Sequence, residues 1–133
     1  MSEQDAERWE FTDRPAGSGV PAGPDGDAVA ELRRRIAGGR GETWLRSSRG
    51  RELAVVSNGE RAMVMLLDGP GDPGGHAVDP GEDGWSEGFL LAGGQEDAYP
   101  DADTVPLGRA LELVRCLLET GAPPPDAPWS VDR

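Results

Sequence analysis

Two apolar segments on either side of a short turn constrain the fold of this chain more than any other feature. Residues 52–57 and 62–67 are rich in apolar side chains, and the dipeptide Asn58-Gly59 lies between them. This dipeptide readily adopts the positive φ of a tight hairpin turn. Because both segments are apolar on successive residues, we expect two central strands that are covered on both faces.

A helix is predicted on the N-terminal side of this hairpin. Val29, Leu32 and Ile36 recur at spacings of three and four residues, which is the spacing of one face of a helix. Asp27 is the expected N-cap, and Gly38-Gly39 is the expected end of the helix.

A second helix is predicted near the C-terminus. We expect Asp103 or Thr104 to cap it, Pro106 to lie in its first turn and Gly121 to end it. The single cysteine, Cys116, lies inside the apolar pattern and is expected to be a small buried side chain. The predicted apolar face consists of Leu107, Ala110, Leu111, Val114, Leu117 and Leu118.

Further strands complete the prediction of the fold. We expect strands at residues 43–47 and 88–92, a hairpin partner for the latter at 95–99, and a docked tail around Trp129. The order of helix, strands and helix predicts an α+β fold, in which a mostly antiparallel sheet of about five to six strands packs with two helices.

The chain is expected to form a single domain. Its 133 residues suffice for one modest core. Residues 1–26 contain several Gly and Pro breakers and are predicted to be a flexible N-terminal segment, with one short edge strand at residues 8–12. Residues 27–133 are predicted to be the α+β domain.

The negative charge of the chain is concentrated in one stretch. The formal net charge is −12, and residues 62–108 contain ten of the 25 acidic residues and no arginine or lysine. A concentrated field of one sign attracts a basic partner and accelerates the encounter. The predicted partner-binding residues are Asp68, Asp72, Asp79, Glu82, Asp83, Trp85, Glu87, Glu96, Asp97 and Asp101.

Trp85 lies in the most acidic part of this stretch. A run of charges is usually a solvated surface, but the exclusion of cations and the presence of a tryptophan favour an interface. Two positions of Trp85 remain open: it anchors a partner from a Gly-punctuated loop, or it folds back onto the core. The strong acidity argues against binding to nucleic acid or to an anionic membrane.

The sequence contains no recognisable catalytic motif, and no cofactor is predicted. The only histidine, His76, would form an acid–base unit or a metal site with Asp79 or Asp72, but a solvated loop histidine is the simpler interpretation. A small hydrolase or metal-dependent enzyme that uses His76 and Asp79 is therefore kept as an alternative to a binding protein.

The expected location is the cytoplasm. A single cysteine excludes an internal disulfide, and the N-terminus lacks the basic and apolar regions of a signal peptide. No apolar run approaches the length that a membrane-spanning helix needs.

Several short motifs, in their order along the chain, resemble the actinobacterial members of immunity protein family 1 of bacterial polymorphic toxin systems. The resemblance covers residues 42–133. The motifs are residues 55–66 (VVSNGERAMVML), 71–80 (GDPGGHAVDP) and 88–95 (GFLLAGGQ), Tyr99-Pro100 with residues 104–106, and residues 121–125 with Trp129.

The resemblance implies an α+β protein that is not an enzyme and that neutralises a cognate toxin, often one with a nucleic-acid (cytosine) deaminase domain, as a 1:1 heterodimer. Deaminases of this kind hold a polyanionic strand near a zinc-activated water. An acidic protein that covers such a site competes with the strand through its carboxylates, although inhibition by distortion from another site is equally compatible with the sequence. An acidic adaptor or chaperone for a secreted protein is a further alternative.

Overall fold

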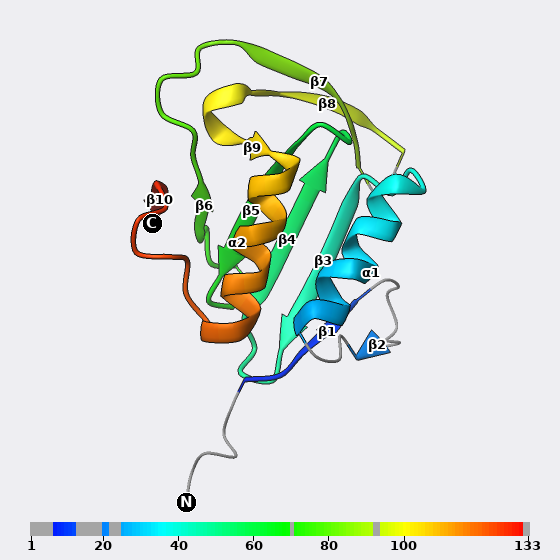
Figure 1. The fold of residues 1–133 in the computed structure, drawn as a ribbon, viewed down its shortest axis with the longest axis vertical. Coiled ribbons are helices and arrows are strands. Elements are labelled where there is room, and N and C mark those ends of the chain that lie inside the picture. Colours follow the sequence, from blue (N-terminus) through cyan, green and yellow to red (C-terminus); the bar gives the residue numbers. More distant parts are fainter. Residues whose placement is uncertain (1–6, 13–19, 22–24, 70, 92–93, 132–133) are drawn as a thin grey trace, which may run out of the picture.

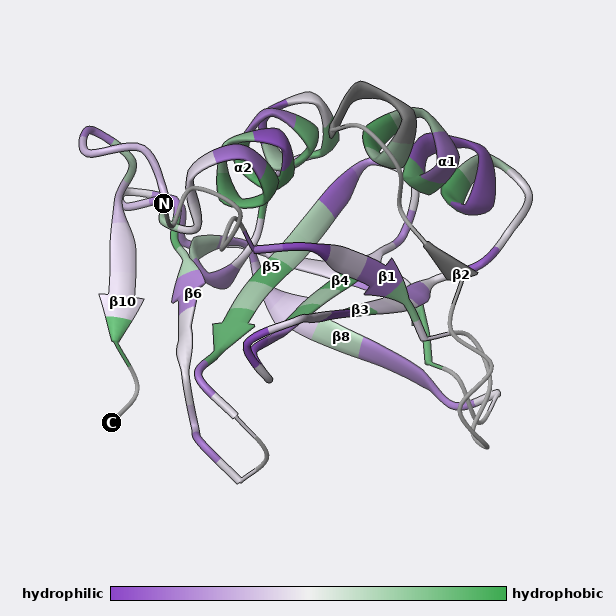
Figure 2. Cartoon of the chain, turned by 90° about the horizontal axis from the view of Figure 1, so that it is seen from below, coloured by the Kyte–Doolittle hydropathy of each residue, from purple (hydrophilic) through white to green (hydrophobic). Residues whose placement is uncertain are grey.

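Two helices cover one face of an antiparallel sheet, and a separate hairpin crosses the opposite face at one end (Figures 1 and 2). This computed structural model describes residues 7–12, 20–21, 25–69, 71–91 and 94–131. The predicted α+β class, with a mostly antiparallel sheet and two helices, is confirmed.

The main sheet has eight strands among the described residues, and several of them are only two or three residues long. Such short strands are difficult to predict, and they account for the excess over the expected five to six. The order is β10 (Trp129–Val131), β6 (Gly75–Ala77), β5 (Arg61–Leu67), β4 (Glu52–Ser57), β3 (Glu42–Ser47), β1 (Trp9–Phe11) and β2 (Val20–Pro21), while β9 (Val105–Pro106) pairs with β5.

The predicted hairpin of β4 and β5 forms the centre of the sheet. Every residue of β4 after Glu52 is buried, as expected for a strand covered on both faces. The turn lies one residue later than predicted, because the Asn58 N–H donates to the carbonyl of Arg61 at 3.2 Å. Gly59 and Glu60 are therefore the two turn residues, and Gly59 has the positive φ of 94° that favours glycine.

Helices α1 (Asp25–Ala37) and α2 (Leu107–Thr120) pack side by side on the sheet (Figure 1). Their apolar faces and the facing side of the strands form the core (Figure 2). Burial of such side chains supplies the main stabilising free energy of the fold. The largest fully buried residues of this core are Phe11, Leu32, Leu45, Leu53, Leu113, Leu117, Val55, Val64 and Val114.

The helix ends agree with the sequence more closely at the C-termini than at the N-termini. Helix α1 begins at Asp25, two residues before the predicted cap at Asp27. Helix α2 ends as predicted at Gly121, whose φ is 80° and whose N–H donates to the carbonyl of Leu117 at 2.8 Å.

The prediction that Asp103 or Thr104 caps α2 is wrong. Pro106 occupies the N-cap position and is not in the first turn, because residues 105–106 pair with β5 as strand β9 before the helix begins at Leu107. The side chain of Thr104 is instead bound to Arg61.

The N-terminal strand is part of the folded body. Strand β1 lies between β3 and β2, so the prediction of an edge strand is wrong. Trp9 and Phe11 are only 8% and 1% exposed and belong to the core. The folded body thus extends N-terminal of residue 27. Residues 1–6, 13–19 and 22–24 of the predicted flexible segment lie outside the described residues.

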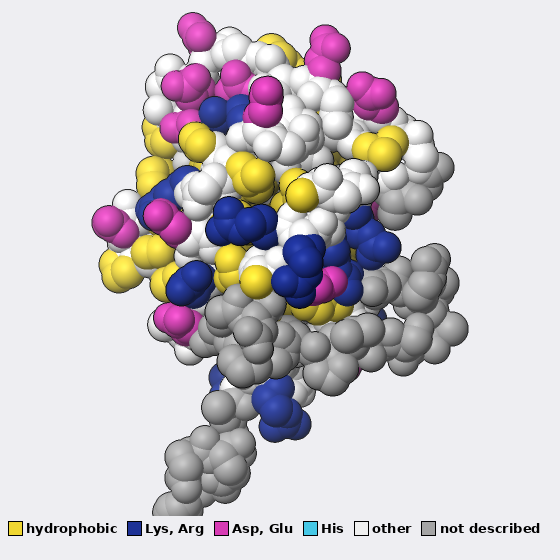
Figure 3. All heavy atoms as spheres, turned by 45° about the vertical axis from the view of Figure 1, so that its right-hand side comes forward, with side chains coloured by type: hydrophobic (Ala, Val, Ile, Leu, Met, Phe, Trp, Pro, Cys, Tyr) yellow, Lys and Arg dark blue, Asp and Glu magenta, His cyan; other side chains and the backbone are white. Residues whose placement is uncertain are grey.

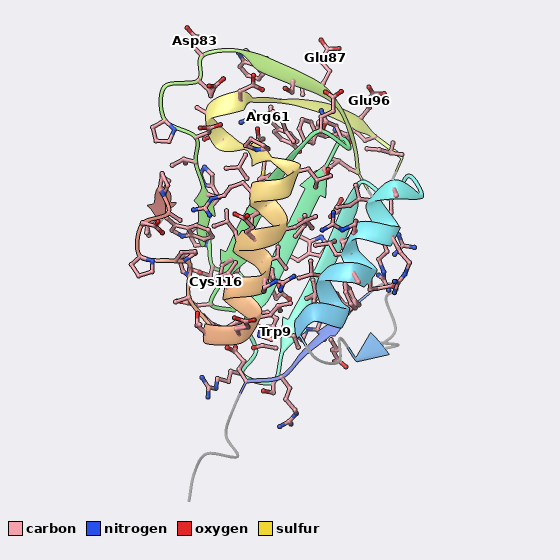
Figure 4. The ribbon with its side chains drawn as sticks, viewed as in Figure 1. Trp9, Arg61, Asp83, Glu87, Glu96 and Cys116 are labelled. Carbon is pink, nitrogen blue, oxygen red and sulfur yellow. The ribbon has the colours of Figure 1, made fainter. Side chains whose placement is uncertain are left out.

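Cys116 is not a core side chain, contrary to the prediction. It is half-buried on α2, and its Sγ lies 3.4 Å from the carbonyl oxygen of Ala122 and 3.7 Å from Thr120 Oγ1 (Figure 4). Neither helix among the described residues is long and apolar enough to cross a membrane.

Candidate protein-binding surface

The predicted acidic surface is divided between two ends of the sheet. Asp68 and Asp72 lie in the loop that follows β5, where Asp72 Oδ2 accepts a hydrogen bond from the N–H of Asp68 at 2.9 Å. The other eight predicted site residues follow β6. The seven residues of β5 span about 20 Å from the Asp68 loop to Arg61 at the opposite end. Asp68 and Asp72 therefore do not join the other acids in one surface.

Arg61 organises the end of the sheet where most of the acids lie. Its Nη2 donates to Asp79 Oδ2 at 2.7 Å, to the Asp101 carbonyl at 3.2 Å and to the Thr104 carbonyl at 3.0 Å. Its Nε donates to Thr104 Oγ1 at 2.8 Å. Asp79 and Asp101 are therefore internal partners of the arginine that precedes the acidic stretch, and they differ in this respect from the predicted site residues that have no such partner.

A hairpin of β7 (Trp85–Leu90) and β8 (Glu96–Pro100) forms a second, two-stranded sheet over this end of the molecule. This confirms the predicted pairing of these segments, although Trp85 begins a strand and does not lie in a loop. The register shifts between Ser86 and Phe89, and Gly88 within this bulge has a φ of 88°.

The inner side of the hairpin is anchored to the main sheet. Phe89 is fully buried, and its ring meets that of Tyr99 edge-on with centroids 5.0 Å apart. Asn58 Nδ2 donates to the carbonyl of Glu87 at 2.9 Å. A Cβ on Gly41 would lie 2.1 Å from the carbonyl oxygen of Leu90, so the backbones pack directly against each other.

Asp97 also has partners within the hairpin. Its Oδ1 accepts from Gln95 Nε2 at 3.1 Å, and its Oδ2 accepts from the Tyr99 hydroxyl at 3.3 Å. Burial, together with the negative charge of Asp97, raises the pKa of Tyr99, so its hydroxyl stays protonated at neutral pH.

The outer side of the hairpin presents exposed apolar and acidic side chains together. Trp85 is 67% exposed and Leu90 is 43% exposed, so the alternative in which Trp85 folds back onto the core is wrong. In Figure 4, Asp83, Glu87 and Glu96 point away from the body, whereas Arg61 lies beneath them. We define the outer hairpin surface as Glu82, Asp83, Trp85, Glu87, Leu90 and Glu96, all of which are exposed.

The carboxylates of this surface are unpaired. Within the described part of the chain, the side chains of Glu82, Asp83, Glu87 and Glu96 form no ion pair or hydrogen bond. Four carboxylates without a cation, beside an exposed indole, can bind the cationic surface of another protein.

His76 lies in β6 between β5 and β10 and its side chain is only 16% exposed, so the simpler interpretation of a solvated loop histidine is wrong. Its Nε2 lies 3.0 Å from Asp103 Oδ1, a partner that the sequence did not indicate. Among the described residues, no group of three or more His, Cys, Asp or Glu side chains could hold a metal ion.

Sequence reasoning missed three residues that build this surface. Arg61 directly precedes the acidic stretch, Asn58 belongs to the predicted turn and Leu90 belongs to the predicted strand at 88–92, and the sequence predicted no site role for any of them. Gly88 is the first residue of the predicted strand at 88–92 but lies inside the observed β7, where the register shifts and Leu90 is exposed. A glycine within a strand often marks such a bulge.

No family model and no curated protein sequence matches this chain. The resemblance to the immunity family therefore stays a prediction.

Proposed function

We propose that this chain is an immunity protein that binds and neutralises a cognate toxin as a 1:1 complex and catalyses no reaction. The observation that carries the proposal is the outer hairpin surface, where Trp85 is 67% exposed among carboxylates that have no internal partner. The resemblance described above supplies the class of partner, a polymorphic toxin with a nucleic-acid deaminase domain.

We propose that recognition has two steps, electrostatic attraction of the partner and then apolar contact with Trp85. The unpaired carboxylates of Glu82, Asp83, Glu87 and Glu96 attract a cationic surface and accelerate the encounter. Trp85 then supplies a large apolar contact, and tryptophan is the residue type most enriched among the energetic centres of interfaces.

A surface that binds its partner well should be held rigidly before the partner arrives, because ordering a mobile surface reduces affinity. Two internal anchors provide this rigidity. Phe89 is fully buried beneath the hairpin, and Arg61 fixes the segments that carry Asp79 and Asp101 on either side of it.

A deaminase suits this surface because its active site must hold a polyanionic strand. We propose that the carboxylates occupy positions that phosphates would otherwise take and thereby compete with the nucleic acid. The complex would form in the cytoplasm of the producing cell, and we propose an interface of the standard size of about 1,600 Å² in total. The hairpin would then be the centre of a larger contact.

The proposal predicts a toxin domain encoded next to this protein, and co-expression with that domain tests it. The toxin domain alone should stop growth, and this protein should restore it and co-purify with the domain in a 1:1 ratio. Purified protein should also inhibit deamination of a single-stranded oligonucleotide by the purified domain. Failure to bind the domain, with growth still arrested at equal expression, would reject the proposed function.

A further inference from the structure

A groove with a cavity volume of about 440 Å³ lies between α1 and α2 on the side away from the sheet. Val29 and Leu111 lie at its base and are each only 3% exposed, so the accessible surface of the groove comes mainly from polar and charged side chains. We define the arginine groove by its lining residues, Val29, Arg33, Gly108, Leu111, Glu112 and Arg115.

Two arginines on the walls of this groove are unpaired. Arg33 comes from α1 and Arg115 from α2, and neither side chain forms an ion pair or hydrogen bond within the described residues. By contrast, Arg34 binds Glu31 at 2.6 Å, and Arg109 binds the groove residue Glu112 at 3.2 Å. Two unpaired arginines from neighbouring helices can bind an anionic group through charge-assisted hydrogen bonds.

The outer hairpin surface carries anionic groups of this kind. Trp85 offers an exposed indole, and Glu82, Asp83 and Glu87 beside it offer unpaired carboxylates. Figure 3 shows the separation of charge: acidic side chains gather at the upper end, and most of the visible arginines lie below them on the helical face. The carboxylates would form charge-assisted hydrogen bonds with the guanidinium groups of Arg33 and Arg115, and the indole would contact these groups through its ring face.

We infer that the arginine groove of one molecule binds the outer hairpin surface of a second copy of this chain. The contact is intermolecular because β7 is fixed at its own end of the protein, where Asp101 N–H donates to the Gly84 carbonyl at 2.8 Å and Ser86 Oγ donates to Asp101 Oδ1 at 2.5 Å. The two surfaces are different patches of one molecule, so association is head-to-tail and extends into chains unless it closes into a ring.

The net charge of −12 does not prevent this contact at physiological ionic strength. Repulsion between distant parts of two molecules is largely screened beyond about 8 Å at 0.15 M salt, whereas charges in direct contact are screened much less. The inference uses the surface of the proposed function but does not rest on toxin binding. If the inference holds, Trp85 is covered by a second copy of this chain when the protein is concentrated and no toxin is present.

Sedimentation velocity from 1 µM to 1 mM protein in 0.15 M NaCl tests the inference. The weight-average mass of the wild type should rise with concentration. Trp85→Ala and Arg115→Glu should each weaken self-association by about tenfold or more. Arg46→Glu, which makes the same change of charge at an exposed site on β3, should leave self-association unchanged.

A mixture of Trp85→Ala and Arg115→Glu tests whether the two surfaces bind each other. Trp85→Ala retains an intact groove, and Arg115→Glu retains an intact hairpin surface, so an equimolar mixture should form a 1:1 dimer that does not grow further. A wild type that stays monomeric to 1 mM, or a mixture that does not dimerise, would overturn the inference. If inorganic phosphate then perturbed the NMR amide signals of Arg33 and Arg115, the groove would bind a small anion instead. Toxin binding is measured in a separate experiment, so a failure of the proposed function can be distinguished from a failure of self-association.

Discussion

Arg61 and Asp79, which are 18 residues apart in the sequence, form an ion pair with Arg61 Nη2 2.7 Å from Asp79 Oδ2. Both side chains are largely shielded from solvent, with exposed fractions of 17% and 31%. The same guanidinium group also binds Thr104 and the carbonyl of Asp101. One cation therefore ties together three chain segments beneath the acidic hairpin.

Replacing Arg61 with methionine should lower the free energy of unfolding by about 2–4 kcal/mol, because its shielded acceptors lose their partner. Urea denaturation measures this change. Arg109→Met is the matched control: Arg109 pairs with Glu112 on the helix surface, and a change within about 0.5 kcal/mol is expected. Equal losses in the two variants would contradict the role of Arg61.

Reversing Glu82, Asp83 and Glu87 to arginine should slow association with the toxin domain by about tenfold or more at 0.15 M salt, because steering is lost. Stopped-flow kinetics measures the rate constant, and the difference from the wild type should shrink at high salt. The control reverses three exposed acids elsewhere, Glu10, Glu119 and Asp126, for the same change of net charge. If the control slowed association equally, total charge and not this surface would govern the rate.

Trp85→Ala should accelerate dissociation from the toxin domain by about tenfold or more and leave the melting temperature nearly unchanged, because the side chain is 67% exposed. Phe89→Ala provides the contrast. Phe89 is fully buried, and its truncation should cost about 3–5 kcal/mol of folding stability. A marked loss of stability in Trp85→Ala would show that the indole packs internally.

The contribution of Glu7 to stability should depend on pH. Burial raises the pKa of Glu7, but hydrogen bonds from Arg51 and Ser47 outweigh that effect, and the net pKa is lowered from its ordinary value of 4.5. The two guanidinium contacts are 2.5 and 2.9 Å long. Because the folded-state pKa is below the unfolded one, this stabilisation is present above the unfolded pKa and is lost as the pH falls through the folded pKa.

Glu7→Gln should therefore reduce the free energy of unfolding by about 1–3 kcal/mol at pH 7, and its difference from the wild type should shrink as the pH falls through the folded-state pKa of Glu7. Urea titrations at a series of pH values measure the two curves. A difference that stayed constant down to pH 2 would show that the carboxylate charge is not involved.

Gly41→Ala tests the close packing of the hairpin against the main sheet. The added Cβ would lie 2.1 Å from the Leu90 carbonyl oxygen, so the hairpin must shift, and a loss of about 1–3 kcal/mol is expected. Gly108→Ala is the matched control, because a Cβ there meets no atom within 4 Å and alanine favours a helix. The control should be neutral or slightly stabilising in thermal unfolding, and a similar loss in both variants would contradict the close packing at Gly41.

The central fold follows from local patterns that the sequence displays directly. Strands β4 and β5 follow from two runs of apolar residues around a turn, and the helix end at Gly121 and the β7–β8 pairing follow from glycines, so the sequence predicts all of them. The N-cap of α2 was not predicted correctly. Residues 105–106 pair as β9 with β5, a strand more than 40 residues away, and the helix therefore begins after the residues that the local pattern indicated as caps.

The candidate site was only partly predictable, for the same reason. Composition indicated which carboxylates share a stretch of chain, and Glu82, Asp83, Glu87 and Glu96 are indeed exposed. It did not indicate that Asp79 and Asp101 would bind Arg61, or that a strand would carry Asp68 to the far end of the sheet. Those positions depend on tertiary contacts between segments distant in the sequence.

The two sides of the β7–β8 hairpin differ in how strongly they constrain the sequence. Phe89 and Tyr99 hold it in place from the inside, whereas Trp85, Glu87 and Glu96 face outward and contribute little to the core. Mutations on the outer side can therefore accumulate without endangering folding. If this surface binds a toxin as proposed, substitutions on it would change which toxin is bound, while the side chains that hold the hairpin in place stay the same.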